Sequence, residues 1–125
     1  MPDRLYHYTT EEFARECLAD MDAGRGVMLE ASDGLYGPGI YALDLGFEDA
    51  SRDALRWECF GDARAEHPMN GVLVLDHALS DEPFEHIEGR IWLMDAPART
   101  PCLVDGLIVA IGTWSAGEWT VVSYE

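Results

Sequence analysis

Residues 5–12 read LYHYTTEE, and this stretch carries the chain from a strand into a helix. Residues 4–8 alternate and are rich in aromatic side chains, which predicts a short strand. Thr9 and Glu12 have the spacing of a capping box, so a helix should begin there. Its apolar residues recur at helical spacing and share one face: Phe13, Cys17 and Met21. The glycines of residues 24–26 are expected to end this helix.

The rest of the chain predicts several strands and one more helix. Apolar runs that favour strands occur at residues 27–31, 39–43, 72–76 and 91–94. The longest helical pattern covers residues 48–65. Residues 107–112 and 119–124 are expected to form a terminal hairpin, and loops are expected at 32–38, 85–89 and 97–101. Many strands with two segregated helices are typical of an α+β fold.

Length and composition indicate one domain over residues 1–125, with 48% hydrophobic residues for its core. No apolar run approaches the ~18 residues that span a bilayer. The first residues lack the basic and apolar regions of a signal peptide, so we expect a cytoplasmic protein or one delivered by a specialised secretion system.

The three cysteines, Cys17, Cys59 and Cys102, are far apart and odd in number, which disfavours a disulfide framework.

The charge is strongly one-sided, with 24 acidic residues against 8 basic ones and a formal net charge of −16. Every basic residue is an arginine. Such a field repels phosphate backbones and anionic membranes, which disfavours direct nucleic-acid or membrane binding. Two explanations stay open: simple solubility, or an acidic face that docks on a basic partner or mimics nucleic acid.

Two short motifs contain the candidate site. His7 lies near the end of the first strand, just before a helix N-terminus whose free N–H groups suit a carboxamide or a phosphate. Residues 37–42 read GPGIYA, in which glycines allow a close backbone approach and Tyr41 can stack on an aromatic ring. Taken alone, each motif also has an ordinary explanation, as a structural histidine and as a tight turn with a core tyrosine.

Taken together, YHYT at residues 6–9, GPGIYA at 37–42, and the helix and strand that follow resemble the ADP-ribosyltransferase superfamily. The chain looks most like the His-Tyr-Glu branch. That branch includes the poly-ADP-ribose polymerases, small bacterial toxin domains and the rifamycin-modifying enzymes. The resemblance implies a compact split β-sheet core with two main helices. It also implies NAD as co-substrate and no metal.

The resemblance assigns roles to the two motifs. His7 would hydrogen-bond a ribose hydroxyl of NAD, and the backbone of Tyr8 would hold the nicotinamide carboxamide. Tyr41 would stack on the nicotinamide ring. Thr9 and Gly39 complete the two walls of the implied cofactor pocket. One departure is Tyr8 itself, because the polymerases have glycine after the histidine.

The family often adds a small hydroxyl and a second aromatic side chain from the following helix. The nearest residues of those types are Ser51 for the hydroxyl and Trp57 or Phe60 for the aromatic ring.

A separate cluster raises the alternative of a metal site, but its spacing fits no usual ligand set. That cluster consists of His77, Asp81, Glu85 and His86.

Two carboxylates compete for the role of catalytic acid. Glu82 follows a predicted strand and precedes Pro83, as the acid does in the rifamycin-modifying enzymes. Glu118 begins the last strand and is followed by Trp119 and β-branched residues, as in the polymerases. The local pattern favours Glu118, with Glu82 nearly level. Either residue is also explained as a solvated turn residue.

Three functions follow from the resemblance. The first is an NAD-dependent mono-ADP-ribosyltransferase that modifies a protein, an RNA end or a small molecule. The second is an NAD glycohydrolase with water as acceptor. The third is a non-catalytic, acidic relative that binds a partner such as an immunity or inhibitor protein. The net charge favours a basic protein or a cationic small molecule over free RNA as acceptor.

Overall fold

A computed structural model describes residues 3–34, 36–61, 66–79 and 83–125. It contains two α-helices, two short 3₁₀ helices and ten strands within these residues. In chain order the elements are β1 (Arg4–Thr9), α1 (Glu11–Asp22), β2 (Met28–Glu30), β3 (Ser32–Gly34), β4 (Gly37–Leu43), α2 (Arg52–Phe60), β5 (Gly71–Asp76), η1 (His77–Leu79), β6 (Glu85–Glu88), β7 (Ile91–Asp95), β8 (Pro101–Leu103), η2 (Asp105–Leu107), β9 (Ile108–Ser115) and β10 (Glu118–Ser123).

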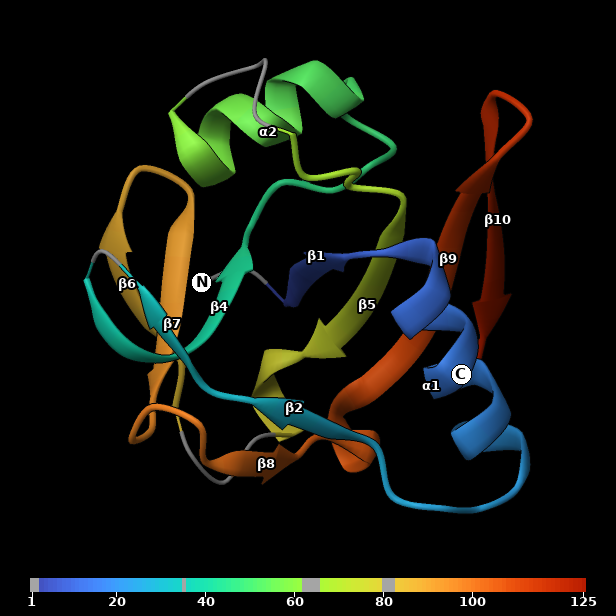
Figure 1. Cartoon of the computed structure of the whole chain (residues 1–125), viewed down its shortest axis with the longest axis horizontal. Helices are drawn as coiled ribbons and strands as arrows, with labels where there is room; N and C mark the ends of the chain where they lie inside the picture. Colours follow the sequence, from blue (N-terminus) through green and yellow to red (C-terminus); the bar gives the residue numbers. More distant parts are fainter. Residues whose placement is uncertain (1–2, 35, 62–65, 80–82) are drawn as a thin grey trace.

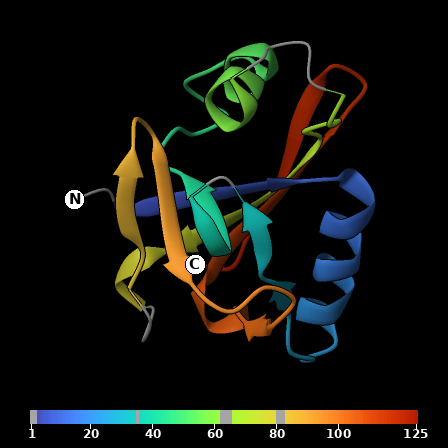
Figure 2. The ribbon, with the colours of Figure 1, turned by 60° about the vertical axis from the view of Figure 1, so that its left-hand side comes forward.

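One large antiparallel sheet dominates the molecule, in the order β10-β9-β5-β1-β4-β7-β6, with β3 paired to β4 beside this path. Strands β2 and β8 form a separate two-stranded ladder. Helix α1 packs on β5 and β9, whereas α2 lies at another end of the sheet (Figure 1). In a view turned by 60°, α1 and the β6–β7 pair lie on opposite sides of the molecule (Figure 2). The α+β prediction with two main helices is therefore confirmed.

The sheet divides between β1 and β4. Strand β1 pairs with β5 along its whole length, from Arg4 opposite Asp76 to Thr9 opposite Gly71. Between β1 and β4, by contrast, the register contains Tyr6 opposite Leu43 and no further pair. The two halves of the sheet consequently diverge beyond Tyr6, and residues 7–9 of β1 have a strand partner on the β5 side alone.

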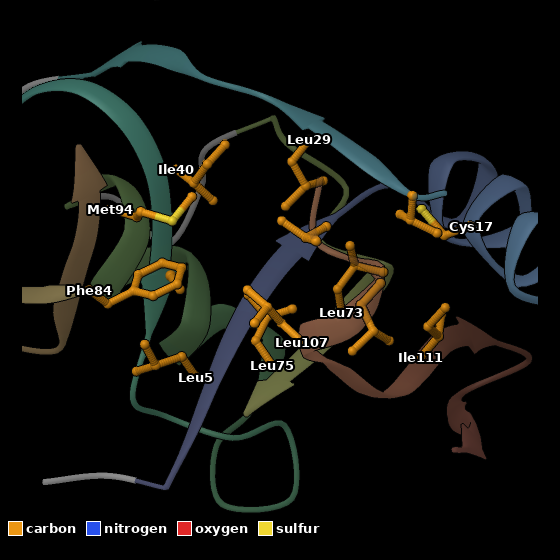
Figure 3. Packing of buried hydrophobic residues seen from close by; sticks show 14 of the residues in the cluster. Leu5, Cys17, Leu29, Ile40, Leu73, Leu75, Phe84, Met94, Leu107 and Ile111 are labelled. Atoms are coloured by element: carbon orange, nitrogen blue, oxygen red, sulfur yellow. The ribbon is translucent and has the colours of Figure 1, made fainter. Parts of the chain in front are cut away.

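The main core fills the space between α1 and the sheet. Buried side chains from β1, β5 and β9 and from the inner face of α1 form this core, which extends away from α1 to Leu5 and Phe84 (Figure 3). They include Leu5, Cys17, Leu73, Leu75 and Ile111. A second, smaller cluster forms under α2 from Leu43, Leu55 and Met69, with Tyr8 packed against it. This second cluster attaches α2 to the diverging part of the sheet.

Both helices begin at a side-chain cap, but not where the periodicity alone suggested. The Oγ1 atom of Thr10, rather than Thr9, accepts from the backbone N–H of Phe13 at 3.1 Å, because β1 continues through Thr9. Helix α2 begins later than the predicted residue 48, and residues 62–65 of the predicted range 48–65 lie outside the described residues. The Ser51 hydroxyl caps its start, and Gly61 in the left-handed region (φ 69°) closes its end.

Three predicted loops contain strands instead. Residues 32–38 include β3 and the start of β4, residues 85–89 include β6, and β8 begins at the end of 97–101. These strands are only three or four residues long and carry no apolar alternation. Strands β3 and β6 are extended by pairing with β4 and β7, and β8 by pairing with β2 in the separate ladder. The terminal hairpin is confirmed, with Ala116 (φ 54°) and Gly117 (φ 83°) in its tight turn.

Candidate functional site

A cavity of about 850 Å³ lies along the divergence of β1 and β4. Its walls come from β1, the β3–β4 turn and β4, the C-terminal half of α2, and residues 67–69. Its volume is within the range of small-molecule sites, roughly 300–1,000 Å³. The lining contains many aromatic side chains and a few polar groups, which is the usual composition of a ligand pocket.

The cavity brings both sequence motifs together, although they are 34 residues apart. Six of the residues expected to contact the cofactor line it: His7, Tyr8, Thr9, Gly39, Tyr41 and Trp57. Ser51 does not line it, because its hydroxyl accepts from the backbone N–H of Ala54 at the start of α2. Ser51 is thus a helix cap in this structure.

His7 has a defined tautomer. Its Nδ1 atom lies 2.7 Å from the backbone oxygen of Tyr41. A carbonyl oxygen only accepts, so Nδ1 carries the hydrogen and Nε2 of the neutral ring keeps a lone pair. Burial lowers the pKa of His7 below its ordinary value, and the neighbouring His67 lowers this pKa further. At neutral pH the residue therefore presents a hydrogen-bond acceptor.

The ring of Tyr41 is held from two sides. Its hydroxyl donates to the backbone oxygen of Gly37 at 2.5 Å and accepts from the backbone N–H of Tyr36 at 3.0 Å. Gly34 lies directly against the ring, so that any Cβ at this position would collide with it. The β3–β4 turn consequently sets the plane of this aromatic ring before any ligand arrives.

Gly39 lines the cavity. Packing against the neighbouring strand, rather than close approach of a ligand, explains why this position is a glycine. A Cβ at this position would collide with the backbone oxygen of Met94 on the neighbouring β7. Its φ of 156° is also a conformation that favours glycine. The glycine thus permits the close pairing of β4 with β7, which shapes the wall behind Tyr41.

The hydroxyl of Tyr8 is engaged in a hydrogen bond within the protein. The hydroxyl donates to the backbone oxygen of Leu45 at 2.8 Å, and burial raises its pKa. The ring therefore anchors the segment before α2. On the side facing β4, residues 7–9 have no strand partner, so this backbone edge faces the divergence that the cavity follows.

Neither of the two acids expected from sequence is among the described residues that line the cavity. Glu118 begins β10 opposite Ser115, is exposed, and belongs to a strand three positions along the sheet from β1. It is not among the residues that line the cavity. Glu82 lies outside the described residues. The carboxylates that line the cavity within the described part of the chain are Glu30, which is exposed on β2, and Glu58, which is half-buried on α2.

Glu58 and His67 line the cavity, although neither was predicted from the sequence as a site residue. The one sequence signal for Glu58 is its place directly after Trp57 on a helix already expected to contribute to the site. His67 stands in a segment that reads only as a helix breaker, so no local pattern identifies it. Both line the cavity because residues 67–69 and α2 fold over the same side of it.

The mouth of the cavity has exposed aromatic side chains. Trp57 is 60% exposed and Phe60 is 51% exposed on α2, and Tyr36 lies on the β3–β4 turn. Cys59 also lines the cavity, but burial raises its pKa to about 12, so it is a neutral thiol rather than a nucleophile at neutral pH.

Comparison of the chain with protein-family models, curated proteins and solved structures finds no match. Within residues 3–34, 36–61, 66–79 and 83–125, no three His, Cys, Asp or Glu side chains come together as a metal site. Neither helix of this described part is long and apolar enough to cross a membrane. The chemistry of the cavity is therefore the feature of the molecule that indicates a function.

Proposed function

We propose that the cavity binds NAD by its nicotinamide ribose end and that the protein is a mono-ADP-ribosyltransferase. The observation that carries this proposal is the hydrogen bond of 2.7 Å between His7 Nδ1 and the backbone oxygen of Tyr41. It unites in one cavity the two motifs that resemble the His-Tyr-Glu branch of the superfamily. The divergence of β1 from β4 also agrees with the split sheet that this resemblance implies.

The nicotinamide group of NAD matches the walls of the cavity. It is a flat, cationic ring, and the held ring of Tyr41 offers a stacking surface. Its carboxamide both donates and accepts hydrogen bonds, as does the backbone edge of residues 7–9 that has no strand partner on the side of β4. The Nε2 lone pair of His7 suits a ribose hydroxyl.

The reaction breaks the bond between ribose C1′ and the nicotinamide nitrogen. Nicotinamide leaves as a neutral molecule with the electron pair of that bond, and positive charge develops on the ribose. The acceptor then forms a bond to C1′ and loses a proton. A carboxylate near the ribose stabilises this charge, an effect of about 10²–10³-fold for one well-placed group.

Glu58 is the acid that this proposal favours among the described residues. It lines the cavity, whereas Glu118 does not. It is half-buried, whereas Glu30 is exposed, and a charge shielded from water interacts more strongly with charge on a ligand. Glu82 stays in the comparison as the second acid expected from sequence.

The negative charge of the protein favours a positively charged acceptor. A net charge of −16 attracts a basic protein surface or a cationic small molecule and repels RNA. The exposed aromatic residues at the mouth, Trp57 and Phe60, would add cation–π attraction for such a group. A basic neutralising protein would be attracted in the same way.

Release of nicotinamide from NAD, measured on the full chain with and without an arginine-rich protein, tests the proposal. Transfer of adenine-labelled ADP-ribose to the added protein supports a transferase. Equal nicotinamide release without acceptor indicates a glycohydrolase. No release, together with no NAD binding by calorimetry, would contradict both and leave the non-catalytic acidic binding protein.

A further inference from the structure

His67 has the opposite hydrogen-bonding character to His7. The backbone N–H of Met69 donates to its Nδ1 atom at 3.1 Å. The neutral ring must therefore carry its hydrogen on Nε2, and Nε2 is the ring nitrogen left for a ligand. Burial lowers the pKa of His67, and the charge of Arg56 lowers it further, so the ring is neutral at neutral pH.

Two arginines of α2 hold the backbone of the segment that bears His67. Arg56 donates to the backbone oxygen of His67 at 3.0 Å and to that of Pro68 at 3.2 Å. Arg52 donates to the backbone oxygens of Pro68 and Met69. Three consecutive carbonyl groups are thus satisfied from one helix, which restricts how this segment can move.

Met69 is strained within the same segment. Its φ is 50°, in the left-handed region that residues other than glycine seldom adopt, and its side chain is buried between Leu43 and Leu55. A residue in this conformation costs about 1–2 kcal/mol, which the surrounding contacts must offset. The backbone N–H of this strained residue is the donor that fixes the tautomer of His67.

His7 and His67 line the same cavity and have complementary hydrogen-bonding groups. His7 presents a lone pair, and His67 presents an N–H. A phosphate or carboxylate accepts hydrogen bonds only, and would leave the lone pair of His7 without a partner. A hydroxyl both donates and accepts, so two neighbouring hydroxyls can satisfy both rings.

We propose that His67 binds one hydroxyl of a ribose cis-diol through Nε2–H while the neighbouring hydroxyl donates to Nε2 of His7. This inference rests on the proposed function, because it takes the ribose to be that of the nicotinamide end of NAD. It makes His67 a specificity residue for an unmodified diol. A missing hydroxyl removes one hydrogen bond, and a phosphorylated one places an acceptor against a lone pair.

Calorimetric titration of the full chain tests this assignment with three ligands. These are NAD and two NAD analogues that lack the 2′- or the 3′-hydroxyl of the nicotinamide ribose. The variants are His67→Asn and His67→Gln. Asparagine can keep an acceptor for the N–H of Met69 but lacks the Nε2–H. Glutamine can supply an N–H near the Nε2 position and loses the Nδ1 acceptor.

The expected result is a loss of about 3- to 10-fold in NAD affinity for His67→Asn, with partial recovery in His67→Gln. For one of the two deoxy analogues, His67→Asn and the wild type should bind equally, because the hydroxyl that His67 contacts is already gone. Thermal unfolding of each variant separates this effect from a loss of folding.

An equal loss for NAD and both analogues would overturn the assignment, since His67 would then act through the fold alone. Unchanged NAD affinity in His67→Asn would overturn it as well. If the folded wild type binds none of the three ligands, the proposed function itself fails. That outcome is distinct from wild-type binding that is insensitive to His67.

Discussion

Nδ1 of His7 lies 2.7 Å from the backbone oxygen of Tyr41, and this hydrogen bond crosses the sheet where β1 and β4 cease to pair. The bond replaces the backbone ladder that would otherwise continue between the two strands. It also determines the tautomer of His7, and with it the acceptor that faces a ligand. One contact therefore couples the shape of the cavity to its chemistry.

Substitution of His7 separates those two roles. His7→Asn places an amide N–H where it can still donate to the oxygen of Tyr41, but it removes the Nε2 lone pair. We expect NAD affinity to fall about 10-fold with little change in stability, since a single hydrogen bond to the ligand is lost. His7→Ala should show the same loss and also unfold about 1 kcal/mol more easily. Calorimetry and urea unfolding measure both. Wild-type NAD affinity in His7→Asn would contradict the role assigned to Nε2.

Tyr41 should act through its ring. Tyr41→Phe keeps the stacking surface and loses the two hydrogen bonds to the β3–β4 turn, so NAD affinity should fall less than about 3-fold. Tyr41→Ala removes the ring, and affinity should fall about 10-fold because aromatic stacking contributes about 0.5–1.5 kcal/mol beyond buried area. Tyr124→Phe, outside the cavity, is the control. Equal effects of Tyr41→Phe and Tyr41→Ala would argue against stacking.

The choice of acid is tested by amide substitutions that conserve size. Glu58→Gln should lower the rate of nicotinamide release about 10²–10³-fold while NAD affinity stays nearly constant. Glu118→Gln, remote from the cavity, should keep wild-type turnover, and Glu30→Gln should have a small effect. Single-turnover release of nicotinamide measures each rate. If Glu118→Gln or Glu82→Gln is inactive and Glu58→Gln is fully active, the assignment of Glu58 is wrong.

NAD binding should weaken in acid. Because burial lowers the pKa of His7, its neutral form persists to a pH below the ordinary value of 6.5. Affinity should stay level between pH 7 and 8.5 and fall only as the pH drops below about 6.5, where protonation converts Nε2 from acceptor to donor. Titrations from pH 5 to 8.5 measure this change. His7→Asn should lose most of it, and an unchanged acid dependence in that variant would assign the titration to another group, such as His67.

Gly39 should matter for stability before it matters for binding. Gly39→Ala introduces a Cβ that collides with the backbone oxygen of Met94, in a conformation unfavourable for alanine, so we expect a loss of about 2–4 kcal/mol. Gly106→Ala, where nothing lies within 4 Å of the new Cβ, is the matched control and should change stability little. Urea unfolding compares the two. Equal midpoints would show that β4 and β7 can separate without cost.

Much of the secondary structure was predictable because its signals are local. The alternation of residues 4–8, the apolar run at 72–76 and the hairpin around Ala116 and Gly117 all appear as strands where they were expected. The small strands β3, β6 and β8 were not predictable. They are too short to show a period of their own, and pairing makes them extended: β3 and β6 with the strand that follows each in the sequence, and β8 with the distant β2.

The sequence by itself determined the α+β class and the two motifs around His7 and Tyr41, because turn residues, caps and hydrophobic period operate over a few neighbouring residues. Only the tertiary structure decided which other groups reach the cavity. It brings in Glu58 and His67 and leaves Glu118 three strands away from β1. The physical reason is that membership of a site depends on the long-range order of strands and on where the sheet divides, and no short stretch of sequence encodes either.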